Sequence, residues 1–131
     1  MYKLFFIFVL FIVLDLIYLN FFKSFYESEM NINYSNVKVI PAITAWLCIA
    51  IAYYYTVQQP FENKYLRGII LTIGMYGVYN MTNLAILNKY SYRLALQDSL
   101  WGLSLITLVT YISSIIIKEY PEKYNSQQFF Y

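Results

Sequence analysis

The chain has 131 residues, of which 60% are hydrophobic and 12% are charged, whereas charged residues make up about a quarter of an average soluble domain. This composition predicts an integral membrane protein whose main partner is the lipid bilayer, without a large domain outside it. The formal net charge is only +2 and the basic residues form no block, which excludes a nucleic-acid partner. The chain has one cysteine and no histidine, and it contains no metal-ligand cluster or nucleotide-binding glycine motif. We therefore expect no disulfide, no metal and no cofactor.

Four apolar runs follow one another along the chain, at residues 4–22, 39–56, 66–87 and 94–117. Each is close to the roughly 20 residues that a helix needs to cross a bilayer. The first run resembles a signal peptide, but Asp15 and bulky residues stand where small cleavage-site residues would be, so we expect it to be retained. The sequence predicts an all-α fold, a single domain over 1–131 in which four transmembrane helices form an antiparallel bundle, with a short polar C-terminal tail at 118–131.

The connections between these spans differ in length. Residues 88–91 form a tight link, so the third and fourth spans are expected to form an antiparallel hairpin. Residues 23–38 are longer and polar, and they predict either a surface loop or a short helix at the membrane interface. The face that holds both termini carries five basic residues against four on the other face, which weakly favours termini in the cytoplasm.

Several polar residues lie within the predicted spans. Because the chain alternates in direction, the ends of the first and third spans and the starts of the second and fourth reach the same side of the membrane. At a rise of 1.5 Å per residue, these residues lie at a similar depth, roughly 6–12 Å below that surface. We therefore predict a polar pocket between the first, third and fourth spans. Its expected members are Asp15, Tyr18, Tyr76, Asn80, Thr82, Asn83, Asp98 and Trp101.

The two aspartates are the main functional candidates in this pocket. An acidic residue inside a span costs roughly 2.5–3.5 kcal/mol and usually faces the protein interior, where it is paired or functional. Asp15 and Asp98 together could bind a cation or relay a proton. Alternatively, Asp15 joins helices by hydrogen bonds to Asn83 or Tyr18. For Asp98, the alternative is a stabilising place near a helix N-terminus with Arg93 as its neutralising partner.

The other polar and small residues also have packing explanations. Asn80 and Asn83 could bridge helices, and Trp101 could anchor the protein at the membrane interface. Small residues in the spans are assigned to close helix approach; these are Ala42, Ala45, Ala52, Gly68, Gly74, Gly77 and Gly102.

The segment from Tyr79 to Gly102 reads YNMTNLAILNKYSYRLALQDSLWG. It resembles a family of uncharacterised bacterial and viral membrane proteins, domain-of-unknown-function family 2177, in which Tyr-Asp-x-Thr-Asn-Leu-Ala precedes Asp-x-x-Trp-Gly. The resemblance implies four transmembrane helices and a shared polar set. In this chain that set would be Asp15, Asn80, Thr82, Asn83, Asp98 and Trp101. Asn80 departs from the family, which usually has an aspartate there, and the resemblance implies no reaction.

Three functions follow from these features. The first, which the sequence favours, is permeation or transport of a proton, a cation or a small molecule. Four helices are too few for a wide pore, so this function predicts a narrow path or a homo-oligomer. The second is a lipid-binding or lipid-modifying protein with an aspartate as acid or base, and the third is a non-catalytic structural or assembly protein, for example of a virus. No nucleophile motif appears, so the catalytic residues stay unknown and an enzyme is disfavoured.

Overall fold

The computed structural model describes residues 1–59 and 62–117, and the regular structure of this part is helical. Three of the long helices are α1 (Tyr2–Met30), α2 (Val39–Thr56) and α5 (Tyr92–Ile116), and a 3-10 turn, η1, lies at Tyr34–Asn36. The remaining long helix consists of α3 (Lys64–Thr72), a π-helical segment η2 (Ile73–Gly77) and α4 (Val78–Ile86). All four are long and apolar enough to cross a membrane. The predicted four-helix membrane bundle is therefore confirmed, while the predicted tail at 118–131 lies outside the described residues.

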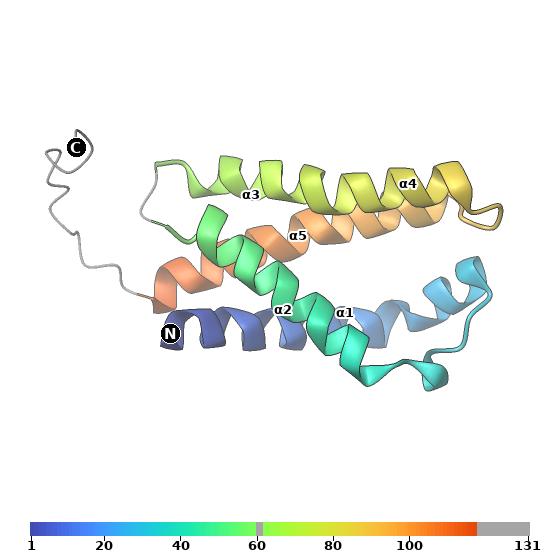
Figure 1. Ribbon diagram of the computed structural model, residues 1–131, viewed down its shortest axis with the longest axis horizontal. Coiled ribbons are helices and arrows are strands. Elements are labelled where there is room, and N and C mark those ends of the chain that lie inside the picture. Colours follow the sequence, from blue (N-terminus) through green and yellow to red (C-terminus); the bar gives the residue numbers. More distant parts are fainter. Residues whose placement is uncertain (60–61, 118–131) are drawn as a thin grey trace, which may run out of the picture.

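The helices surround α5 unevenly. α1 and the helix formed by α3, η2 and α4 pack along α5, whereas α2 crosses α1 obliquely (Figure 1). α2 packs against α1 and α3, and its N-terminal half diverges from η2 and α4 (Figure 1). The start of α1 and the end of α5 lie at the same end of the bundle, as expected for an even number of spans.

α1 extends further than the sequence pattern indicated. It continues to Met30 and ends at Asn31, which adopts a left-handed conformation with φ of 52°. The predicted connection over residues 23–38 is therefore wrong for residues 23–30, which continue α1, and the connection is limited to residues 31–38. No glycine or proline interrupts the segment before Asn31, and the ion pair between Lys23 and Glu27 (3.8 Å) supports the added turns. At 29 residues, α1 is longer than a bilayer core of about 30 Å requires, so its last turns reach the interface.

The half of the bundle that contains the start of α1 and the end of α5, here called the terminal half, is closely packed. The ring of Phe11 meets that of Tyr53 edge-on at 5.5 Å between centroids, and the Tyr53 hydroxyl donates to Thr110 (2.9 Å). Gly68 lets α3 approach α5, since a Cβ at this position would lie 3.0 Å from Ile106. The buried apolar cluster here consists of Ile7, Phe11, Ile49, Ala50, Tyr53, Val57, Leu105, Ile106, Val109 and Ile117.

Candidate binding cavity

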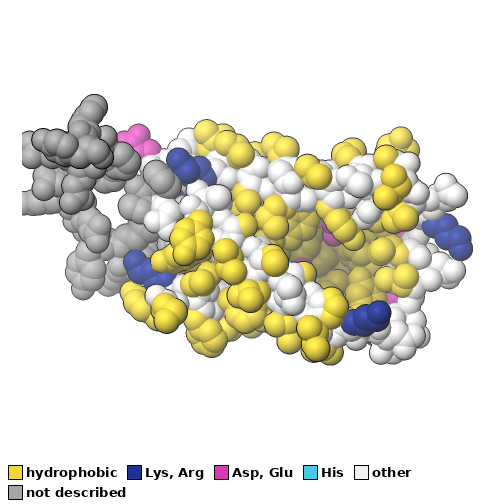
Figure 2. All heavy atoms as spheres, viewed as in Figure 1, with side chains coloured by type: hydrophobic (Ala, Val, Ile, Leu, Met, Phe, Trp, Pro, Cys, Tyr) yellow, Lys and Arg dark blue, Asp and Glu magenta, His cyan; other side chains and the backbone are white. Residues whose placement is uncertain are grey.

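The half of the bundle away from the termini encloses a cavity of about 980 Å³. Its walls come from α1, the N-terminal half of α2, η2, α4 and the first turns of α5, together with the α1–α2 connection. Figure 2, which looks across the long axis of the bundle, shows it as a hollow in the side of the molecule, with apolar side chains around it and acidic atoms inside. Transmembrane helices lie across the bilayer, so an opening in the side of the bundle is in the position to face the acyl chains.

Small residues and one irregular helical turn make room for the cavity. Ala42 and Ala45 line it on α2. Gly102 does permit a close approach, because a Cβ at this position would lie 2.3 Å from Cγ of Tyr76. Tyr76 belongs to η2, and π-helical turns of this kind often occur at functional sites. A Cβ at Gly74 would have no neighbour within 4 Å, so the predicted role of this glycine in close helix approach is wrong.

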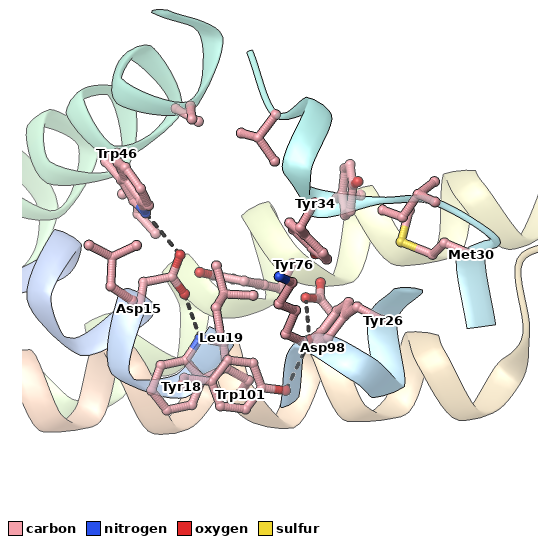
Figure 3. A pocket seen from close by; sticks show the side chains of 18 of the residues that line it. Asp15, Tyr18, Leu19, Tyr26, Met30, Tyr34, Trp46, Tyr76, Asp98 and Trp101 are labelled. Carbon is pink, nitrogen blue, oxygen red and sulfur yellow. Dashed lines mark hydrogen bonds between the residues drawn. The ribbon is translucent and has the colours of Figure 1, made fainter. Parts of the chain in front are cut away.

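Asp15 on α1 is held by both tryptophans of the chain. Its Oδ1 accepts a hydrogen bond from Nε1 of Trp101 (2.8 Å), and its Oδ2 accepts one from Nε1 of Trp46 (2.9 Å) (Figure 3). Asp15 is therefore bound by two indoles, and not by Asn83 or Tyr18, the partners expected from the sequence. Since Trp46 lies on α2, this carboxylate joins three helices, and the pocket involves the second span as well as the three that were predicted.

Asp98 on α5 lies one helical turn before Trp101, closer to the end of the bundle opposite the termini. Its Oδ1 accepts a hydrogen bond from the Tyr26 hydroxyl (3.1 Å), and its Oδ2 accepts one from Nδ2 of Asn80 (2.8 Å). Asn80 in turn accepts from the Tyr90 hydroxyl (2.5 Å). The two aspartates thus line one cavity at two neighbouring levels.

Tyr18 links these two levels. Its ring stacks on that of Trp101, with centroids 4.0 Å apart and planes 3° apart. Its hydroxyl accepts from Nε2 of Gln97 (3.0 Å) and lies 2.9 Å from the Tyr26 hydroxyl. Because Tyr26 donates to Asp98, Tyr18 is left to donate to Tyr26. The hydrogen bonds therefore run in one direction from Gln97 through two hydroxyls to the Asp98 carboxylate.

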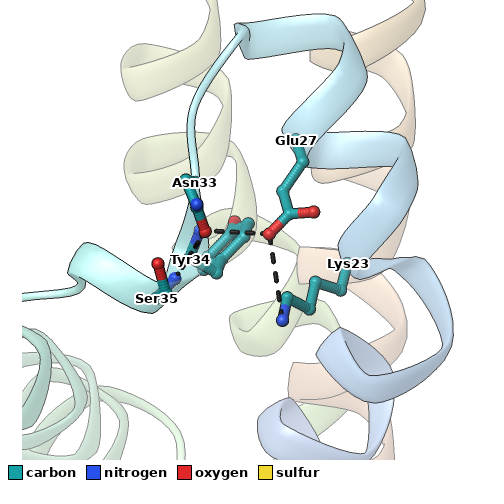
Figure 4. A network of polar contacts seen from close by, with 5 residues as sticks. All are labelled: Lys23, Glu27, Asn33, Tyr34 and Ser35. Carbon is teal, nitrogen blue, oxygen red and sulfur yellow. Dashed lines mark hydrogen bonds and ion pairs between the residues drawn. The ribbon is translucent and has the colours of Figure 1, made fainter.

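Glu27 holds the connection between α1 and α2 over the end of the cavity. Its Oε1 accepts the backbone N–H of Tyr34 (3.1 Å) and pairs with Nζ of Lys23 (3.8 Å) (Figure 4). Asn33 caps the η1 turn by accepting the N–H of Ser35 (2.9 Å). Burial, with a smaller contribution from nearby carboxylates, raises the pKa of Tyr34 to about 12, so this residue is neutral at physiological pH.

The charges of the cavity are unbalanced. The hydrogen bonds to Asp15 and Asp98 come from indole, phenol and amide groups, all of them uncharged. Within the described part of the chain, neither aspartate forms an ion pair, and Arg93 pairs with Glu29 (3.8 Å). The alternative in which Arg93 neutralises Asp98 is therefore wrong. Two acidic groups without a cationic partner can bind a cation or exchange a proton.

The structure brings together most of the predicted pocket residues. Those that line the cavity are Asp15, Tyr18, Tyr76, Asp98 and Trp101. Asn80 is buried behind them and holds Asp98, whereas Thr82 is exposed and neither Thr82 nor Asn83 lines the cavity. Tyr26, Trp46 and Tyr90 also belong to this site and were not predicted from the sequence. The only signal for these residues in the sequence is an aromatic residue at the predicted depth. This signal is weak, because the chain has 16 tyrosines.

The fold and the cavity define a small polytopic membrane protein with an acidic, aromatic-lined site in one half of its bundle. The chain belongs to a family of predicted membrane proteins, DUF2177, whose model matches residues 1–115. The family predicted from the Tyr79–Gly102 segment is therefore confirmed. No curated protein and no solved structure matches the chain.

Proposed function

We propose that the protein binds one amphiphilic lipid, whose chain enters the cavity sideways from the bilayer and whose polar head reaches Asp15 and Asp98. The observation that carries this proposal is the combination of an opening in the side of the helical bundle with two carboxylates inside it. A soluble ligand would have to cross the lipid to reach such an opening, whereas a membrane lipid is already there.

The size and lining of the cavity fit this ligand. Its volume of about 980 Å³ lies at the upper end of the range for small-molecule sites, roughly 300–1,000 Å³. Apolar side chains such as Leu19, Ile49 and Met75 line it beside the aspartates. A mostly apolar wall with a few polar groups at one place is the usual design of a ligand site, because burial gives affinity and the polar groups fix orientation.

Binding fits the packing of the bundle better than permeation does. An ion crossing a single subunit would have to pass the terminal half, where Phe11, Tyr53 and Val109 are fully buried. Passage of a proton is the second candidate function, since the hydroxyls of Tyr18 and Tyr26 lead to Asp98. In the terminal half, the Tyr53 hydroxyl lies within hydrogen-bond distance of the hydroxyls of Thr110 and Ser113, and these groups could continue such a path.

Photolabelling tests the proposed binding directly. A lipid with a diazirine in its acyl chain is added to the protein in nanodiscs, and the labelled residues are located by mass spectrometry. We expect labels on the cavity residues of α1, α2 and η2, and we expect Ala45→Phe to remove them by filling the cavity. Ala85→Phe is the matched control, because Ala85 is exposed on α4 and does not line the cavity.

Two results would overturn the proposal. One is labelling spread over all lipid-facing helices and unchanged by Ala45→Phe. The other is a proton or cation flux in liposomes that Asp15→Asn abolishes, without any cavity labelling, and this result would establish permeation instead.

A further inference from the structure

We infer that the bound amphiphile carries a primary ammonium group as its head. This inference rests on the proposed lipid binding and names the chemical class of the ligand. It is carried by the cavity as a whole, in which acidic oxygens, tyrosine and tryptophan side chains and apolar walls meet.

The balance of charge favours a cationic head. Asp15 and Asp98 line the same cavity, and their hydrogen-bond donors carry no charge. Lys23 also lines the cavity, but it pairs with Glu27 and its side chain is 54% exposed. In a low-dielectric site two uncompensated carboxylates attract a cation and repel an anion strongly. A fatty-acid carboxylate or a phosphate head would therefore be a poor ligand at this position.

The hydrogen-bonding capacity of the aspartates favours an ammonium group in particular. Each of the four carboxylate oxygens accepts one hydrogen bond from the protein. An ionised carboxylate can accept about four in total, so each aspartate retains acceptor positions. A primary ammonium supplies three donors, and its bonds to carboxylates are charge-assisted and short. An alcohol head supplies one donor and no charge.

The aromatic lining adds to this preference. Eight of the 21 lining residues are tyrosine or tryptophan, and the faces of such rings attract cations. Trp46 and Trp101 direct their N–H edges at Asp15, and the ring of Trp101 stacks on Tyr18, so these two indoles fix the carboxylate in place for the ammonium group. Ca²⁺ and Mg²⁺ fit less well, because each takes six or more oxygen ligands at close distance.

A competition experiment tests this inference. The diazirine lipid labels the cavity in nanodiscs, and four competitors are compared: a long-chain primary amine, the alcohol and the carboxylate of equal chain length, and phosphatidylethanolamine. We expect the amine to compete at least about tenfold better than the alcohol, because it makes hydrogen bonds between charged groups. Competition by phosphatidylethanolamine would identify a membrane phospholipid as the source of the ammonium group, and competition by the simple amine alone would identify a single-chain base.

Variants of the aspartates distinguish the possible failures. In Asp15→Asn and Asp98→Asn we expect the preference for the amine over the alcohol to disappear, while the alcohol still competes and so reports a folded cavity. If the parent binds amine and alcohol equally, the ammonium inference is overturned and lipid binding stands. If no competitor reduces the cavity labelling, the proposed lipid binding fails as well.

Discussion

Gly102→Ala would test the contact that shapes the cavity wall. The added Cβ would lie 2.3 Å from Cγ and 2.5 Å from both Cδ atoms of Tyr76. A flexible chain end could move aside, but these atoms form the base of a ring that lies between η2 and α5. Overpacking of this kind costs about 1–3 kcal/mol. We expect the free energy of unfolding in mixed micelles to fall by this amount and the lipid photolabelling to weaken, because Tyr76 must leave its place.

Gly74→Ala is the matched control, because Gly74 lies on the same helical turn as Tyr76. A Cβ at Gly74 would have no neighbour within 4 Å, and replacing a helical glycine with alanine typically stabilises by about 0.5–1 kcal/mol. The control should therefore be neutral or stabilising, with labelling as in the parent. Equal stability and equal labelling for Gly102→Ala and Gly74→Ala would refute the proposed contact between Tyr76 and Gly102.

Three further predictions concern the hydrogen bonds and the connection. Trp46→Phe removes one donor from Asp15 and should lower the free energy of unfolding by about 1.5–3 kcal/mol; an unchanged denaturation midpoint would contradict the bond. Asn80→Ala should weaken competition by the amine, since Asn80 holds Asp98, whereas Thr82→Ala should leave it unchanged. Equal effects of the two substitutions would contradict the assignment of Asn80, and not Thr82, to the site. Burial raises the pKa of Tyr34 and of Tyr90 to about 12. The contribution of these two tyrosines to the free energy of unfolding is complete below pH 10 and is lost as the pH rises to 12. The double variant Tyr34→Phe/Tyr90→Phe should therefore lose less stability over this pH range in alkaline unfolding titrations.

The bundle itself could be predicted because membrane insertion leaves a strong pattern. Runs of about 20 apolar residues allow few alternatives to helices, and three of the four spans begin and end within a few residues of the prediction. The exception was α1, whose polar last turns lacked the apolar signal and looked like a loop. Helix continuation there depends on contacts such as the bond from Ser91 to Glu29 (2.5 Å), and a sequence pattern does not reveal such contacts.

The site could be predicted in part, and the missing part has a physical cause. Depth along each span placed Asp15 and Asp98 in one region, but depth does not say which face of a helix points inward. Thr82 lies at the expected level yet is exposed, and Trp46 was missed because the oblique crossing of α2 brings its start over α1. The oblique crossing of α2 also opens the side of the bundle. The shape of the cavity depends on this crossing angle, which the sequence pattern does not predict.

Tryptophan fluorescence tests the central claim most directly, since Trp46 and Trp101 both line the cavity and are the only tryptophans in the chain. The protein is placed in bilayers whose acyl chains carry bromine, which quenches tryptophan on contact, and acrylamide serves as the quencher from water. The account predicts strong quenching by the brominated chains, reduced by Ala45→Phe, and weak quenching by acrylamide. Strong quenching by acrylamide without quenching by the brominated chains would show a cavity filled from water and would contradict entry from the bilayer.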